Sequence, residues 1–284
     1  MDKLYIIAQK DQQQTDAVSS GIALAQQLNL RPEIGAYSYE SLSGDAYDHD
    51  VADSAQAQVM AADKAAIDDL LHRLDACQTP ITQNWCKHLA EHACQHVRPE
   101  NYAMMLKSIH ESEQFLPADW QLIRNTQVPL MLMSNKPLNK PESILMAVDL
   151  GTNKPDKQRL NQAIIAQAKR LEAASGCQLH LGFVVRVPKI LRDMDIVNTR
   201  TLIKDAYEKY QQAIAETGLA RDQVHILAGN ADMCLFELSC RLKAQYLVMG
   251  IHKKQGIFGH IIGNTSEAIL GRMRSNILVV PSTR

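Results

Sequence analysis

The chain has 284 residues, of which 46% are apolar and 21% are charged. This composition is typical of a globular protein with a sizeable core, and it excludes disorder and collagen-like repeats. The 30 Lys and Arg residues nearly balance the 31 Asp and Glu residues, so no basic field would draw the chain to nucleic acid or to an anionic membrane. At about 150 residues per domain, the length predicts two domains.

The sequence also indicates a compartment. No apolar stretch approaches the roughly 18 residues that span a bilayer, and the N-terminal stretch becomes polar too early for a secretory signal. The six Cys residues are scattered without paired short spacings, which is typical of reduced thiols. We therefore expect a cytoplasmic protein with no membrane span.

Strands and helices are predicted to alternate along the first half of the chain. Short, nearly continuous apolar runs indicate strands covered on both faces, and apolar residues at helical spacing indicate helices between them. The predicted strands are Leu4 to Gln9, Glu33 to Tyr39, Ile81 to Trp85, Tyr102 to Leu106 and Val128 to Met133. The predicted helices are Thr15 to Leu28, Val51 to Leu74, Cys86 to Val97 and a short one near Trp120 to Asn125.

The second half repeats this order, beginning with Ile144 to Asp149, which matches Leu4 to Gln9. The further strands are Gln178 to Val187, Gln223 to Ala228, Tyr246 to Gly250 and Asn276 to Val280. The helices are Lys157 to Ala174, Ile196 to Glu216, Asp232 to Leu242 and Thr265 to Met273. Such alternation predicts α/β units with parallel five-stranded sheets. A polar, proline-containing link separates the two predicted domains, residues 1–136 and 141–284.

Candidate binding residues follow two strands of the second half. In an open parallel sheet, ligands bind beyond the carboxyl ends of the strands. Asp149 ends the first strand, and Gly250 opens a loop that reaches Gly263 before a helix, whose first N–H groups would form an anion site. Alternatively, both glycines are turn residues, and Asn264 with Glu267 forms a capping box that needs no ligand.

The duplicated strand order, the aspartate at the end of a first strand, and the run from Val248 through residues 263–268 to Pro281 resemble the universal stress proteins, specifically the bacterial tandem type. The resemblance covers the whole chain, but the specific motifs lie in its second half. It implies two sandwiches of the adenine-nucleotide α-hydrolase-like fold. It further implies that Val128 to Met133 pairs with Asn276 to Val280 in a pseudo-dimer, so that the chain is a monomer or a homodimer.

Nucleotide-binding members of that family carry a loop of Gly, two residues, Gly, nine residues, Gly, then Ser or Thr. Gly250 and Gly263 match the first and third glycines, but Lys253 takes the place of the second. Asn264 stands where the hydroxyl residue belongs, and Thr265 follows one position late. The Lys253 side chain would either block the pocket or supply a charge in place of a backbone donor.

The resemblance also implies the ligand, which is ATP or another adenine nucleotide. Asp149 would contact the base or the sugar, and Val185 near the end of the second strand would line the base pocket. In the first half Gln9 replaces the aspartate, and the loop from Lys107 to Pro117 contains no glycine. We therefore expect the first half to bind no nucleotide and to have a structural or regulatory role.

Three histidines offer a different chemistry. His88, His92 and His96 are spaced i, i+4 and i+8 on one predicted helix, so each neighbouring pair could share a zinc ion. Eight residues of helix rise about 12 Å, so all three cannot bind one ion, and further ligands would have to come from elsewhere. The alternative is an amphipathic helix with its histidines turned to solvent.

The leading hypothesis is a cytoplasmic stress-response protein that binds a small ligand and acts through binding rather than turnover, since no residue set supplies an evident nucleophile with its base. One alternative is an interaction module that needs no ligand. A second is a metal-binding protein that uses the His88 to His96 helix. The last is an ATP-using enzyme of related architecture.

Overall fold

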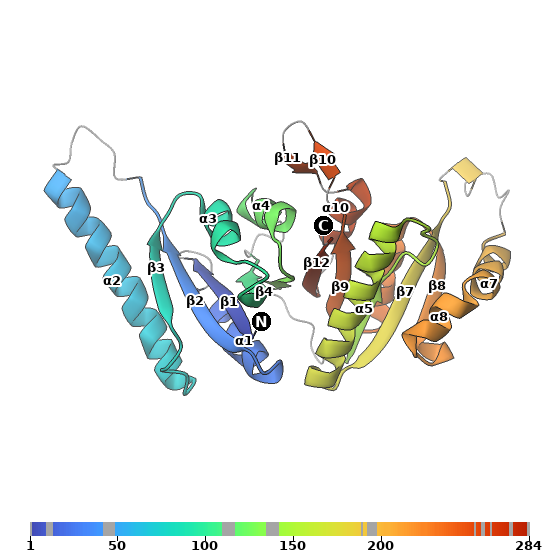
Figure 1. Ribbon diagram of the computed structural model, residues 1–284, viewed down its shortest axis with the longest axis horizontal. Coiled ribbons are helices and arrows are strands. Elements are labelled where there is room, and N and C mark those ends of the chain that lie inside the picture. Colours follow the sequence, from blue (N-terminus) through green and yellow to red (C-terminus); the bar gives the residue numbers. More distant parts are fainter. Residues whose placement is uncertain are drawn as a thin grey trace. The chain divides into compact units, whose positions relative to one another are not determined.

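The chain divides into two compact units, Met1–Asn135 and Lys136–Arg284, which are described separately (Figure 1). The structure is a computed structural model. It describes residues 2–9, 14–41, 49–109, 117–134, 142–188, 190–191, 198–252, 254–256, 259–261, 263–272 and 275–282.

The first unit alternates strands and helices, as its apolar periodicity predicts. Its strands are β1 (Lys3–Gln9), β2 (Arg31–Ser38), β3 (Ile81–Trp85), β4 (Tyr102–Ser108) and β5 (Leu130–Met133). Its helices are α1 (Gln14–Gln27), α2 (His49–Arg73), α3 (Leu89–His96) and α4 (Pro117–Asn125). The strands form a parallel sheet in the order β3-β2-β1-β4-β5.

Helices cover both faces of this sheet. Successive residues of a strand point to opposite faces. On β1, Ile6 lies under α1 because Gly21 of that helix has no side chain to separate them, and the neighbouring Tyr5 packs its ring against His96 of α3. Helices α3 and α4 pack against one another. The first unit is therefore a three-layer α/β sandwich.

The second unit has the same plan. Its strands are β6 (Ser143–Ala147), β7 (Gln178–Arg186), β8 (Val224–Gly229), β9 (Ala244–Ile251) and β12 (Asn276–Pro281). Its helices are α5 (Pro155–Ser175), α7 (Thr199–Lys209), α8 (Gln211–Thr217), α9 (Ala231–Arg241) and α10 (Asn264–Leu270). The main sheet is parallel, in the order β12-β9-β6-β7-β8. A small antiparallel hairpin of β10 (Lys254–Gly256) and β11 (Gly259–Ile261) precedes α10.

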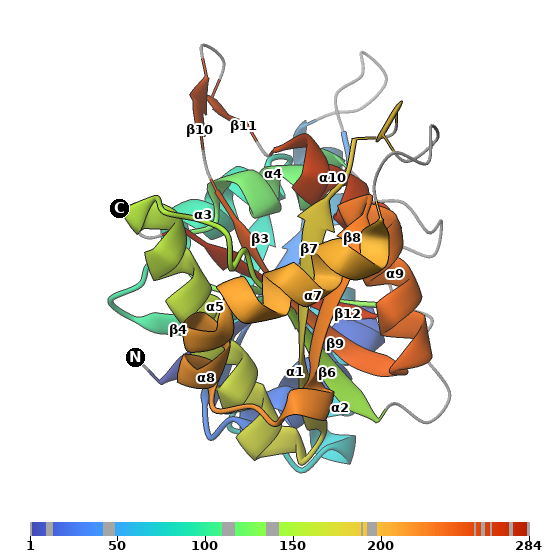
Figure 2. The same cartoon turned by 90° about the vertical axis from the view of Figure 1, so that its right-hand side faces the viewer.

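The contacts of two glycines show which helix covers each face of this second sheet. Gly250 lies against Leu160 and Ile164 of α5, whereas Gly182 faces Leu235 and Leu238 of α9. Figures 1 and 2 show α5, α7 and α8 on one side of the strands and α9 on the other. The predicted fold class, two tandem five-stranded α/β sandwiches, is confirmed for each unit. The pairing of their final strands in a pseudo-dimer stays a prediction.

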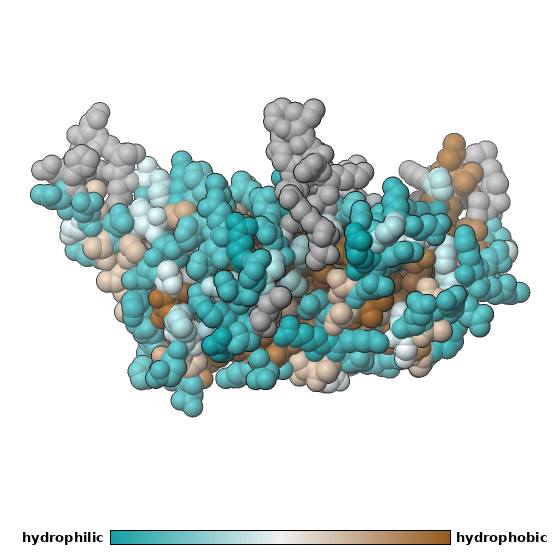
Figure 3. Space-filling view, viewed as in Figure 1, coloured by the Kyte–Doolittle hydropathy of each residue, from teal (hydrophilic) through white to brown (hydrophobic). Residues whose placement is uncertain are grey.

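The central strands of both sheets form the apolar core. The five central residues of β1 are at most 1% exposed, and every residue of β12 is buried. On the face seen in Figure 3, the coloured residues of both units are mostly hydrophilic. Among the described helices, not one is both long enough and apolar enough to cross a membrane.

Two predicted helices differ from the observed ones. The helix predicted over Ile196 to Glu216 is two helices, because Tyr210 between α7 and α8 has φ −104° and ψ 17°. The helix predicted over Cys86 to Val97 begins only at Leu89 and ends at His96. Hydrophobic periodicity continues across both places, so it does not reveal where the backbone leaves the helix.

Two histidines meet side by side on strands β7 and β8. His180 Nδ1 lies 3.1 Å from His225 Nε2, a distance at which one imidazole donates a hydrogen bond to the other. Burial lowers the pKa of both rings, and for His225 the neighbouring His180 adds to this effect. A second proton would leave the pair with no acceptor, so the fold requires at least one neutral ring.

This pair predicts an acid-sensitive second unit. Because the folded pKa values lie below the ordinary histidine value of about 6.5, the unfolded chain takes up protons first. The stability that the neutral pair contributes is therefore complete above pH 6.5 and is lost as the pH falls from there through the folded pKa values. We expect the melting temperature, followed by circular dichroism, to fall more between pH 7.5 and 5.5 in the wild type than in the double variant His180→Val, His225→Val. An equal fall in both proteins would contradict this assignment.

Candidate functional site

The strand order of the second unit reverses between β6 and β9. The chain proceeds from β6 outward through β7 to β8, and then returns to β9 on the other side of β6. Ala147 at the end of β6 pairs with Gly182 of β7 and with Met249 of β9. Asp149 and Gly250 therefore lie at neighbouring strand ends, where a doubly wound sheet places its ligand. Val185, near the end of β7, is half-buried on the next strand.

Asp149 is held in place by helix α5. The side chain of Asn161 accepts a hydrogen bond from the Asp149 N–H at 3.1 Å and donates one to the Asp149 carbonyl at 2.8 Å. Lys157, one helical turn earlier, forms an ion pair with Asp149 Oδ2 at 3.3 Å. The Asp149 side chain is 50% exposed. The backbone is thus fixed while the carboxylate remains open to solvent.

Gly250 has a packing role. A Cβ at this position would lie 2.7 Å from Leu160 Cγ and 2.8 Å from Ile164 Cδ1, far closer than carbon atoms approach without displacement. The glycine lets α5 lie close to β9. A structural role therefore explains Gly250 without a ligand.

Gly263 has no such explanation. Its φ of −69° is available to any residue, and among the described residues no atom outside its immediate neighbours lies within 4 Å of the place where a Cβ would stand. It is the N-cap of α10, and Asn264 is the first helical residue, so the predicted capping box with Asn264 as the N-cap is wrong. Thr265 is the second residue of this helix and is half-buried. Helix α10 packs against α9. Lys253 lies outside the described residues.

His252 follows the end of β9, next to the Gly250 strand end. Its Nδ1 is buried and makes no hydrogen bond within the described part of the chain. A buried polar nitrogen without a partner is unfavourable. This ring nitrogen is therefore available to a water molecule or a ligand.

Residues 142–281, which span every element just described, match the model of the Universal stress protein family. The second unit of this chain is a universal stress protein domain. The predicted resemblance to this family is thereby confirmed.

Relatives of this universal stress protein domain extend the match toward the first unit. Universal stress protein E of Escherichia coli strain K12 is 24% identical over 208 residues, which are 69% of this chain and 66% of that protein. The universal stress protein E homologue of Haemophilus influenzae is 21% identical over 212 residues, or 70% of this chain and 69% of the homologue. The match thus spans slightly less than two thirds of the E. coli protein.

Solved structures of universal stress proteins match over nearly the whole chain. A structure from Pseudomonas aeruginosa UCBPP-PA14 has a TM-score of 0.71 at 22% identity and covers 99% of this chain and 93% of its own. One from Archaeoglobus fulgidus has a TM-score of 0.65 at 14% identity, with 99% and 98% covered. At these identities the likeness shows the fold, which is thus shared by the first unit.

The first unit differs from the universal stress protein domain at the corresponding strand ends. Gln9 stands at the place of Asp149, and the pairing of Ile7 with Lys107 shows that Lys107 corresponds to Met249. Lys107 Nζ and Asp119 Oδ1 of α4 form an ion pair at 2.9 Å, with side chains that are only 1% and 0% exposed. A buried charge pair therefore stands where the second unit carries the uncharged residues Met249 and Ser266.

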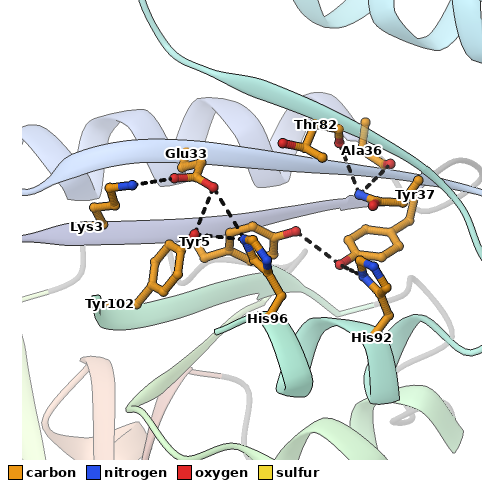
Figure 4. A network of polar contacts seen from close by, with 10 residues as sticks. Lys3, Tyr5, Glu33, Ala36, Tyr37, Thr82, His92, His96 and Tyr102 are labelled. Atoms are coloured by element: carbon orange, nitrogen blue, oxygen red, sulfur yellow. Dashed lines mark hydrogen bonds and ion pairs between the residues drawn. The ribbon is translucent and has the colours of Figure 1, made fainter. Parts of the chain in front are cut away.

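Two of the three predicted zinc residues, His92 and His96, lie in a network of tyrosines on the α3 side of this first sheet (Figure 4). His92 Nδ1 is 3.0 Å from the hydroxyl of Tyr37, which in turn lies 3.1 Å from that of Tyr5. Burial raises the pKa of Tyr5 to about 12 and also raises that of Tyr37. Both phenols therefore stay protonated, and the hydrogen-bonded row ends at His92.

His96 belongs to a second row. Tyr102 donates a hydrogen bond of 2.8 Å to Glu33 Oε1, and its hydroxyl lies 2.8 Å from His96 Nε2. Lys3 donates to Glu33 Oε2 at 3.0 Å. Burial alone would raise the pKa of Glu33, but the hydrogen bonds from Lys3 and Tyr102 outweigh it and hold that pKa below its usual value. The carboxylate is therefore charged, and Tyr102 connects it to the imidazole.

These contacts give His92 and His96 a structural role. His88 is the N-cap of α3, so it precedes the helix that the other two share. Within the described part of the chain, no group of three His, Cys, Asp or Glu residues is placed to hold a metal ion. The buried side of α3 is as the amphipathic interpretation predicts, since Leu89, Ala90, Ala93 and Cys94 are buried, but His92 and His96 hydrogen-bond to tyrosines of the sheet instead of turning wholly to solvent. The zinc site at His88, His92 and His96 stays a prediction.

Sequence reasoning missed several residues around Asp149. Lys157 and Asn161 lie four residues apart on one face of α5, and that spacing could have identified them. Gly151 and Tyr210 also face Asp149, as described below, but no sequence signal marks Tyr210. Its position depends on the break between α7 and α8.

Proposed function

We propose that the second unit binds ATP or another adenine nucleotide at the ends of β6, β7 and β9, and that the chain acts in a stress response through binding rather than turnover. The observation that carries this proposal is the placement of Asp149 and Gly250 at the switch in strand order of a universal stress protein domain. The fixed backbone and open carboxylate of Asp149 suit it to accept hydrogen bonds from a base or a ribose.

Three further features support a site at this edge. Gly263 has free space that the fold does not require, and Thr265 lies beside it on α10. Val185 offers an apolar wall at the end of β7. His252 Nδ1 is buried and lacks a protein partner among the described residues. Together with Lys253 and Asn264, these residues form the proposed phosphate and base contacts.

The first unit takes no nucleotide in this proposal. Gln9 replaces the carboxylate, and the edge is occupied by the Lys107–Asp119 ion pair. We assign to this unit a structural or regulatory role. We further propose a cytoplasmic location, which the six free cysteines support.

Calorimetric titration with ATP tests the proposal. We expect wild-type protein to bind ATP and Asp149→Ala to bind it about tenfold more weakly or worse, because a hydrogen bond to a charged group contributes about 1.5–3 kcal/mol. Asp205→Ala, which removes an exposed carboxylate of α7, serves as the charge-matched control and should leave the affinity unchanged. The absence of binding at millimolar ATP, or equal binding by the Asp149 variant, would refute the proposed site.

A further inference from the structure

Tyr210 brings an aromatic ring from the α7–α8 junction to the loop that follows β6. Its ring meets the ring of Phe183 edge-on, with centroids 5.3 Å apart and planes at 84°. Its hydroxyl lies 3.0 Å from the position that a Cβ of Gly151 would occupy. A residue from a distant part of the chain therefore stands directly beside the Asp149 loop.

The same point is close to the carboxylate. Asp149 Oδ1 lies 3.7 Å from the position that a Gly151 Cβ would occupy. The Tyr210 hydroxyl and this oxygen therefore lie close to the same point. Lys157 is paired with the other oxygen, Oδ2. Across the residues that the structure describes, neither Asp149 Oδ1 nor the Tyr210 hydroxyl makes a hydrogen bond. An acceptor and a donor thus both lie within 4 Å of the place of a Gly151 Cβ.

Such a pair is complementary to a heterocycle that presents a donor next to an acceptor. Adenine does so, with its exocyclic amine beside ring nitrogens that accept hydrogen bonds. We propose that Tyr210 is a base-recognition residue of the second unit: its hydroxyl donates to a ring nitrogen of adenine while Asp149 Oδ1 accepts from the amine. This inference rests on the nucleotide site proposed above and adds the residue that reads the base.

Gly151 is part of the same arrangement. Any side chain at this position would begin 3.0 Å from the Tyr210 hydroxyl and 3.7 Å from Asp149 Oδ1, and would fill the space between them. The absence of a side chain at Gly151 therefore keeps the Tyr210 hydroxyl and Asp149 Oδ1 accessible to one ligand group.

Titration of wild type and Tyr210→Phe with ATP and with inosine triphosphate tests this assignment. Inosine carries an oxygen in place of the amine and a proton on the adjacent ring nitrogen, so its donor and acceptor are reversed. We expect the wild type to prefer ATP, and Tyr210→Phe to bind ATP about three- to tenfold more weakly while its affinity for inosine triphosphate changes little. Tyr39→Phe, at an exposed tyrosine of the first unit, is the matched control and should behave as wild type.

The outcomes separate the two proposals. Unchanged ATP affinity in Tyr210→Phe, in a wild type that binds ATP, overturns the role of Tyr210 and leaves the nucleotide site standing. Equal weakening for ATP and inosine triphosphate also overturns base recognition, because the hydroxyl would then contact a part that both ligands share. A wild type that binds neither nucleotide refutes the site and the inference together. Phenylalanine keeps the ring packing on Phe183, and an unchanged melting temperature will verify that the variant is folded.

Discussion

Replacing Asp119 by alanine is expected to lower the free energy of unfolding of the first unit by about 3–5 kcal/mol. The change removes the carboxylate that pairs with the buried ammonium of Lys107, and breaking a buried ion pair by removing one partner is strongly destabilising. Urea unfolding followed by tryptophan fluorescence measures the effect specifically, because both tryptophans of the chain, Trp85 and Trp120, belong to the first unit.

Two further variants test whether the lost stability comes from the buried ion pair. Asp69→Ala breaks the exposed ion pair with Arg73 and should cost less than about 1 kcal/mol. The double variant Lys107→Met, Asp119→Ser introduces the residues that the second unit carries at the corresponding places, Met249 and the third position of α10. It should recover most of the lost stability, because a buried ion pair can be exchanged for uncharged residues at little cost. A loss as small in Asp119→Ala as in Asp69→Ala would show that the buried pair is not essential.

Gly35→Ala is expected to destabilise the first unit by about 3 kcal/mol. Gly35 lies on β2 under the ring of Tyr5, and a Cβ there would stand only 2.5 Å from its Cζ atom. The methyl group would push Tyr5 aside and break its buried hydrogen bond to Tyr37. Tryptophan fluorescence during urea unfolding again gives the measurement.

A second substitution tests the cause. If the clash with Tyr5 is responsible, Gly35→Ala should lower the free energy of unfolding far less in a Tyr5→Leu background than in the wild type. Leucine is chosen because Leu145 occupies the corresponding position of β6. The two changes together should then cost at least about 1 kcal/mol less than the sum of the single changes. Additive losses would place the strain elsewhere in β2.

Much of the fold follows from local patterns. Apolar runs such as Ile81–Trp85 define buried strands, and that strand is predicted with its observed bounds. The repeat then defines the plan of both units. The break at Tyr210 and the β10–β11 hairpin were not predicted, because both depend on backbone geometry within stretches whose residues are compatible with a helix or a loop.

The candidate site is predictable only where it follows a strand end. Asp149 and Gly250 are identified because parallel strands bring their carboxyl ends to one edge. Tyr210 is far from both in sequence, and only tertiary packing brings it to Gly151. For His92 and His96 the spacing along the helix suggests metal ligands. Their hydrogen-bond partners are tyrosines on neighbouring strands, and the spacing of residues along one helix gives no information about those contacts.

The Lys107–Asp119 pair also constrains how the two halves of the chain can evolve. A single substitution at either position passes through a protein about 3–5 kcal/mol less stable, a large share of the roughly 5–15 kcal/mol that holds a domain folded. Conversion to the uncharged arrangement of the second unit therefore requires both changes nearly together. The first unit can therefore exchange this pair only through a strongly destabilised protein, whereas the second unit, with Met249 and Ser266 at the corresponding places, carries no such constraint.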